Sequence, residues 1–111
     1  MQVDFSEEGQ SLIARPEGRM DAADGDDFAT AVEQRIGSET SSLTIDLDKL
    51  ESINFGGIRA VLRLARTLKA AQKDLDFVRG NQAVRDVLDQ AGLDDFFQFT
   101  PPYISRRGTR R

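Results

Sequence analysis

Three groups of residues in this sequence have types and spacings that could support chemistry. Asn54-Phe55-Gly56-Gly57 stands at the start of a long helical pattern, where backbone N–H groups could cradle a phosphate. Two aspartates, Asp46 and Asp48, alternate with apolar residues and could act as an acid/base pair. Four carboxylates early in the chain could hold a cation: Asp21, Asp24, Asp26 and Asp27.

None of these groups matches an established pattern for its chemistry. The glycine pair lies in neither a GxxxxGK[ST] nor a GxGxxG motif, and the early aspartates do not have calcium-loop spacing. Negative charge is favoured at a helix start, and Asp46 and Asp48 are interpreted as the polar face of a strand. The chain has no His and no Cys, which removes the commonest general base and thiolate chemistry. We therefore expect a protein that is not an enzyme and uses no cofactor or metal.

Length and charge restrict the remaining possibilities for domain organisation, partner and location. The 111 residues suit one domain with one core, expected at residues 1–100, followed by a basic, disordered tail at residues 101–111. The net charge of −4 argues against nucleic acid as the main partner. The chain has no apolar run of transmembrane length and its N-terminus does not resemble a secretory signal, so we expect a cytoplasmic location without membrane insertion.

Alternating apolar patterns and helical periodicity indicate the elements that position these residues. Strands are predicted near residues 3–5, 12–14, 43–47, 75–78 and 96–99, with residues 16–18 closing the second. A first helix is indicated by Phe28, Val32 and Ile36, and a third by Val84, Val87, Leu88 and Ala91 after a cap at Asn81. The clearest helical face is predicted to lie against the sheet: Ile58, Val61, Leu62, Ala65 and Leu68.

This alternation of strands and helices predicts an α/β fold with parallel pairing and right-handed crossovers. We expect a single domain with a mixed four- to five-stranded sheet and about three to four helices. With so few helices, one face of the sheet could remain uncovered and polar.

Three stretches of the chain, in this order, resemble the STAS domain, the family of anti-sigma-factor antagonists and of the cytoplasmic domains of sulfate transporters. They are EGRMD (17–21), LTIDLDKLESINFGGIRAVLRLAR (43–66) and VRDVLDQAGLDDFF (84–97). The family's central loop usually reads Asp-Ser-Ser/Thr-Gly, and a partner kinase phosphorylates its first Ser. Here Asn54 stands at the Asp position, Phe55 at the phosphoacceptor and Gly56 at the next hydroxyl, so phosphorylation is not expected in this loop.

The resemblance implies a non-enzymatic interaction module that binds an anti-sigma factor or a related kinase-fold regulator. The implied contact residues are Asp21, Asn54, Phe55, Gly56, Gly57 and Arg59. The alternative is a STAS-like subunit of a membrane transport complex that binds its ATPase subunit through the helix from Ile58. A homodimer remains open, as does the placement of Phe55, which either is displayed to a partner or folds back onto the sheet.

Overall fold

A computed structural model describes residues 1–93, which contain five strands and three helices. The strands are β1 (Gln2–Glu8), β2 (Ser11–Met20), β3 (Ser42–Asp46), β4 (Leu50–Ile53) and β5 (Asp74–Val78). The helices are α1 (Ala22–Arg35), α2 (Phe55–Ala70) and α3 (Gln82–Gln90). The predicted α/β class is confirmed. The strand predicted at residues 96–99 and the tail predicted at 101–111 lie outside the described residues.

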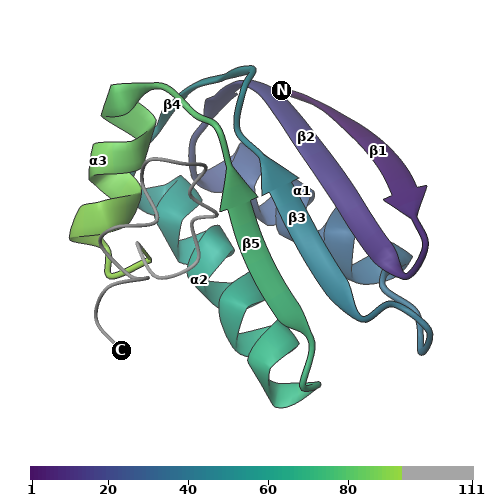
Figure 1. The fold of residues 1–111 in the computed structure, drawn as a ribbon. Coiled ribbons are helices and arrows are strands. Elements are labelled where there is room, and N and C mark those ends of the chain that lie inside the picture. The colour runs from purple at the N-terminus through teal and green to yellow at the C-terminus, as the bar shows by residue number, and fades with distance from the viewer. Residues whose placement is uncertain (94–111) are drawn as a thin grey trace, which may run out of the picture.

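The five strands form one mixed sheet with helices packed against one face (Figure 1). The strand order is β1-β2-β3-β5, and β4 pairs with the far end of β2. Strand β1 is antiparallel to β2, whereas the pairs β2–β3, β2–β4 and β3–β5 are parallel. Helices α1 and α2 lie behind the sheet in Figure 1, and α3 stands beside β4. The face of β2 and β3 turned toward the viewer carries no described helix.

Strand β2 is longer than the sequence pattern predicts. Residues 16–18 were expected to close it, but it continues to Met20. The parallel pairing with β3 ends at Ala14 and the pairing with β4 begins at Gly18, where the register shifts. Pro16 falls between these two pairings, so no parallel neighbour needs the N–H that proline lacks. The Pro and Gly therefore mark a change of partner, and the prediction of a strand end was wrong.

The core lies between the sheet and the inner faces of the helices. Ile58, Val61 and Leu68 of α2 are buried, as predicted. Leu62 and Ala65, also predicted to lie against the sheet, are only partly buried, whereas Leu64, which was not predicted, is fully buried. Helix α2 packs against both α1 and the sheet, so its buried face is wider than a single apolar stripe and is centred nearer to Leu64.

Candidate functional site

Two hydrogen bonds made by Asn54, one by its backbone and one by its side chain, hold the start of α2 in place. The Asn54 N–H donates to the Met20 carbonyl oxygen over 3.1 Å, which ties the end of β4 to the end of β2. The Asn54 side chain caps α2 by accepting a hydrogen bond from the Gly57 N–H at 3.1 Å. This cap satisfies one of the helix's free donors, so the first turn of α2 has a defined position and direction.

Gly56 and Gly57 allow this first turn to pack against α1 and β2. A Cβ added at Gly56 would lie 2.5 Å from the Ala22 Cβ, and one added at Gly57 would lie 2.5 Å from the Met20 carbonyl oxygen. Both distances are far inside van der Waals contact. The Gly57 N–H is used by the Asn54 cap and is not available to a phosphate, whereas both glycines permit the close packing of this turn.

The Phe55 side chain points outward from this fixed turn. It is 87% exposed, and Met1 at 39% is the other exposed large apolar residue among residues 1–93. The sequence left open whether Phe55 is displayed at the surface or folds back onto the sheet. In the structure it is displayed. An aromatic side chain held in water by a rigid helix start is a typical anchor for a protein partner.

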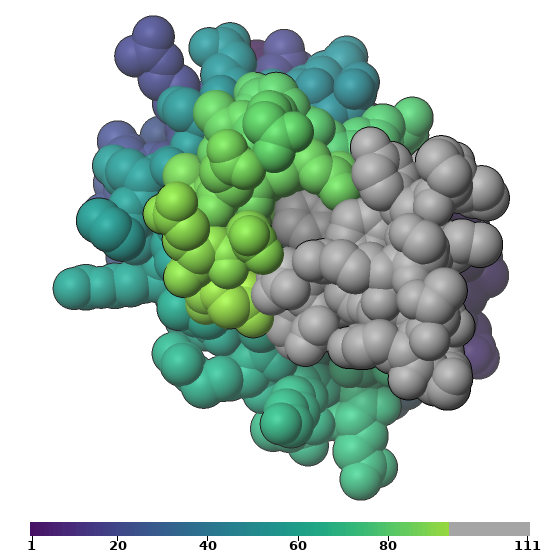
Figure 2. All heavy atoms as spheres, turned by 60° about the vertical axis from the view of Figure 1, so that its left-hand side comes forward, coloured from purple at the N-terminus to yellow at the C-terminus, as the bar shows by residue number. Residues whose placement is uncertain are grey.

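An apolar groove of about 480 Å³ lies beside Phe55, between the start of α2 and the side of α3. Its lining residues are Ile53, Asn54, Phe55, Ile58, Val87, Gln90 and Ala91. Figure 2 looks at the side of the molecule that carries α3 and shows the teal segment of the chain next to the green atoms of that helix. Phe55 is therefore one wall of a larger apolar surface and not an isolated exposed ring.

The structure brings the predicted contact residues to the same end of the molecule. Asp21 is exposed and caps α1, its carboxylate accepting a hydrogen bond from the Asp24 N–H at 2.9 Å. It directly precedes Ala22, the residue that closes against Gly56. Arg59 is exposed one turn after Phe55 on α2.

The contribution of α3 to this surface was missed by sequence reasoning. Val87 and Ala91 were used only as apolar positions that indicate that helix, and in the structure both are partly buried and line the groove. Their four-residue spacing places both side chains on the same side of the helix, and this was the sequence signal that could have indicated the surface. Periodicity alone does not distinguish an apolar face that packs fully from one that remains partly open.

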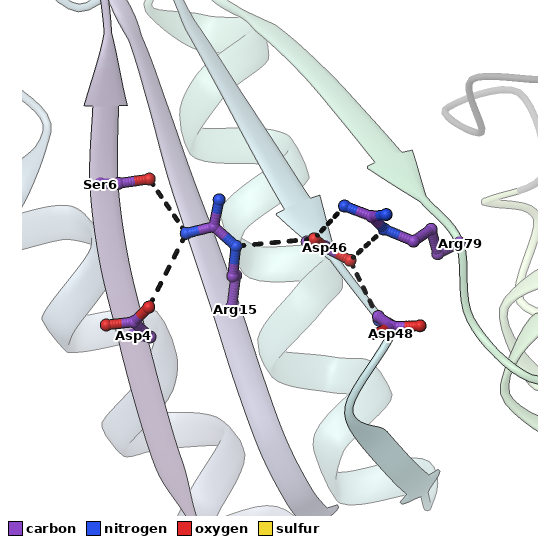
Figure 3. A network of polar contacts seen from close by, with 6 residues as sticks. All are labelled: Asp4, Ser6, Arg15, Asp46, Asp48 and Arg79. Atoms are coloured by element: carbon purple, nitrogen blue, oxygen red, sulfur yellow. Dashed lines mark hydrogen bonds and ion pairs between the residues drawn. The ribbon is translucent and has the colours of Figure 1, made fainter.

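A second hollow lies on the open face of the sheet and is lined mostly by charged and polar residues, among them Asp46. Figure 3 shows the polar contacts around Asp46. Arg79 donates to the two Asp46 carboxylate oxygens at 3.1 and 2.9 Å, and the Asp48 N–H donates to the same carboxylate at 3.1 Å. Arg15 approaches it to 3.6 Å. Asp46 and Asp48 were interpreted as the polar face of a strand. Asp46 does lie among polar residues on the open face of the sheet, but its side chain is only 5% exposed and is paired with guanidinium groups. Asp48 lies beyond the end of β3.

The ion pair of Asp46 also fixes the turn that leads into α3. Arg79 has a left-handed backbone, with φ at 62°, and is followed by Gly80 and the α3 cap Asn81. The Asn81 side-chain amide donates to the Glu51 carbonyl oxygen of β4 at 3.1 Å, so α3 is attached to the strand that leads to Phe55. We interpret the network as a structural support for the α3 wall of the groove.

The Asp46→Asn variant should be less stable than the unmodified chain near neutral pH. Burial by itself would raise the pKa of Asp46, but the hydrogen bonds from Arg79 and the Asp48 amide and the positive charges of Arg79 and Arg15 outweigh it and hold the pKa below its usual value. A carboxylate whose pKa is lowered by folding stabilises the fold above its unfolded pKa of about 3.9 and loses that contribution as pH falls through the lower folded value.

We expect Asp46→Asn to lower the free energy of unfolding by about 1 to 2 kcal/mol at pH 7, since Arg79 is largely exposed and the pair is partly screened. The difference from the unmodified chain should persist at pH 5 and vanish in stronger acid. Urea unfolding at several pH values measures it, with Asp76→Asn as the control on the neighbouring strand. A difference independent of pH would contradict the assigned role of the charge.

The early aspartates do not assemble into a metal site in the described structure. Asp24 lies 3.7 Å from the N-terminal amine and Asp26 lies 3.8 Å from Arg63. Within residues 1–93, no group of three or more His, Cys, Asp or Glu side chains is arranged to hold a metal ion. No helix in this range is long and apolar enough to cross a membrane.

Comparison with known proteins gives one family and a consistent set of folds. The family model described as "Mlab, STAS domain" matches residues 3–101. A putative anti-sigma factor antagonist from Thermotoga maritima superposes with a TM-score of 0.78 at 15% identity, covering 98% of this chain and 95% of that one. An anti-sigma factor antagonist from Mycobacterium paratuberculosis gives a TM-score of 0.75 at 17% identity, with coverages of 99% and 94%.

The anti-sigma factor antagonist SpoIIAA in its unphosphorylated form gives a TM-score of 0.72 at 17% identity, with coverages of 99% and 100%. At such identities these similarities show a shared fold. A search of the curated proteins found no match.

Proposed function

The chain belongs to the STAS domain family, and from this premise we propose that it is a non-enzymatic interaction module for an anti-sigma factor or a related kinase-fold regulator. The observation that carries the proposal is the 87% exposure of Phe55 at the capped start of α2. Phe55 and the adjoining groove form the contact surface, together with Asp21, Asn54, Gly56, Gly57 and Arg59. A cytoplasmic regulator of transcription is the cellular role that fits such a module.

The proposed module is not switched by phosphate in this loop. Phe55 and Gly56 carry no hydroxyl group. A serine at position 56 would bring its Cβ to 2.5 Å from the Ala22 side chain and 2.8 Å from the Ala22 backbone nitrogen. Both the residue types and the packing therefore favour a docking surface that is always available and is controlled by the partner's supply or state.

Phe55→Ala tests the proposal because it separates binding from folding. The side chain makes little packing contact, so the thermal midpoint should change by no more than a few degrees. Affinity for the partner should fall at least tenfold, since truncating a central aromatic anchor often costs about 2 kcal/mol or more, roughly thirtyfold in Kd. Calorimetric unfolding and titration with the protein recovered from native cells measure the two quantities.

Phe5→Ala is the matched control, because Phe5 lies on β1 beneath the Arg35 guanidinium, away from α2. It should bind the partner normally once folded. Phe55→Asp should weaken binding more than Phe55→Ala, since it places a charge in an apolar contact. Unfolding of the Phe55→Ala variant, or unchanged affinity, would refute the docking role of Phe55.

The second candidate is a subunit that binds the ATPase of a membrane transport complex. It is supported by the exposed side of α2 beyond Phe55, which offers a long surface for a large partner. The identity of the protein recovered from native cells separates the two candidates. An anti-sigma factor supports the first candidate and a transport ATPase supports the second.

A further inference from the structure

Helix α2 differs in charge from the rest of the chain. Its sequence, FGGIRAVLRLARTLKA, contains four cationic residues and no carboxylate, although the whole chain has a net charge of −4. An exposed helix usually mixes both signs, because opposite charges three or four residues apart stabilise it. Within α2 itself these cations have no such partner.

Five residues of α2 form a single outward line, which we call the α2 ridge: Phe55, Arg59, Leu62, Arg66 and Lys69. Their spacing of i, i+4, i+7, i+11 and i+14 keeps them within about 40° of one line along a helix of 3.6 residues per turn. Burial agrees with this geometry, since Leu62 is partly buried and the other four are exposed. The opposite side of α2, with Val61 and Leu64, lies in the core.

The fourth cationic residue of α2, Arg63, does not lie on the ridge, and carboxylates of α1 already pair with its charge. Arg63 turns toward α1, where it donates to Glu33 at 2.7 Å and lies 3.8 Å from Asp26. The hydrogen bond from Arg63 lowers the pKa of Glu33, outweighing the effect of burial. Among residues 1–93, the ridge cations Arg59, Arg66 and Lys69 have no carboxylate within 4.0 Å.

Acidic helices stand on both sides of the ridge. Helix α1, packed along one side of α2, carries the exposed carboxylates Asp26 and Asp27. On the other side, across the groove, α3 carries exposed Asp86 and Asp89. A broad anionic surface such as a membrane or a nucleic-acid duplex would meet these carboxylates as well as the ridge. A narrow acidic element, such as a single helix, can contact the ridge without meeting the carboxylates of α1 and α3.

We propose that the α2 ridge receives an acidic amphipathic helix of the partner protein. Phe55 enters an apolar pocket at one end of that helix, and carboxylates of the partner pair with Arg59, Arg66 and Lys69 along about 20 Å of ridge, at 1.5 Å per residue. The inference rests on the proposed function and deepens it, because it states the chemistry of the partner surface.

Photo-cross-linking tests the inference in the full-length chain. A photoreactive amino acid is placed at position 66 in native cells, and the cross-linked peptides are identified by mass spectrometry. We expect a helical partner segment with a net negative charge. A neutral or basic segment, or a cross-link only to lipid or nucleic acid, overturns the inference.

Charge reversal of the ridge then tests the energetics with the purified cross-linked protein as the probe. Arg66→Glu combined with Lys69→Glu should raise Kd at least tenfold at low salt, and the Kd of the unmodified chain should rise at least tenfold between 50 and 500 mM NaCl. Lys49→Glu is the control, an exposed lysine bordering the hollow on the open sheet face. Binding of the unmodified chain to phosphatidylglycerol vesicles or duplex DNA with comparable affinity would contradict an acidic protein helix.

The two proposals fail in distinguishable ways. If Phe55→Ala weakens binding but reversal of Arg66 and Lys69 does not, docking at Phe55 stands and the acidic helix is wrong. If reversal weakens binding but Phe55→Ala leaves it intact, the ridge binds an acidic partner and the anchoring role of Phe55 is wrong.

Discussion

Leu64→Ala is expected to lower the free energy of unfolding by about 2 to 5 kcal/mol, the usual cost of truncating a fully buried leucine. Leu64 has no exposed surface, and its helix packs against both α1 and the sheet, so we expect its truncation to leave a cavity. For a domain of this size, each kcal/mol corresponds to about 4 to 8 °C in thermal midpoint. Guanidinium unfolding and calorimetry give the two values.

Leu62→Ala is the matched control on the same helix. Leu62 is a partly buried member of the ridge, so its truncation should cost clearly less stability than that of Leu64. Arg63→Ala is unsuitable as a neutral control, because Arg63 bonds Glu33 and Thr30 of α1. Equal losses from the two leucine variants would mean that the buried face of α2 is assigned wrongly.

Gly57→Ala is expected to lower the free energy of unfolding by about 2 kcal/mol or more, although alanine is favoured over glycine within helices by about 1 kcal/mol. The added Cβ would lie 2.5 Å from the Met20 carbonyl oxygen and 2.8 Å from the Ile53 side chain. The carbonyl belongs to the backbone at the end of β2 and cannot rotate away. Local crowding should therefore outweigh the gain in helix propensity.

Gly37→Ala provides the control for this substitution. A Cβ at Gly37 would meet no atom within 4 Å, and the backbone there is not left-handed. Its stability should remain within about 0.5 kcal/mol of the unmodified chain, as for ordinary surface changes. A stabilised Gly57→Ala variant would show that α2 can shift outward, and the fixed position of Phe55 would then be in doubt.

Patterns that repeat along the chain predicted the regular elements well. The cap at Asn81 and the apolar spacing of α3 depend on residues within about two helical turns, and both are present. Strand β4 was not predicted, because its four residues, LESI, are too few to show an alternation. Its burial and pairing depend on β2, which lies more than thirty residues earlier in the chain.

Features that depend on distant partners could not be predicted from local pattern. Asp46 alternates with apolar neighbours, as a residue on the polar face of a strand would, and only the fold brings Arg15 and Arg79 to it. The orientation of Phe55 likewise follows from contacts of Gly56 with Ala22 and of Gly57 with Met20, which fix the turn. The family resemblance located the loop, but the side of the helix that Phe55 occupies is a property of packing.

The position of β2 between its neighbours bears on the order in which the chain folds. Strands β1 and β2 are joined by a tight turn at Gly9 and Gln10, with Glu8 opposite Ser11, so this hairpin closes at little cost in chain entropy. Adding β3 brings Ser11 beside Ser42 across 31 positions and requires α1 as the crossover. Because β2 pairs with β1, β3 and β4, we expect substitutions in β2 to slow folding and those in α3 mainly to speed unfolding.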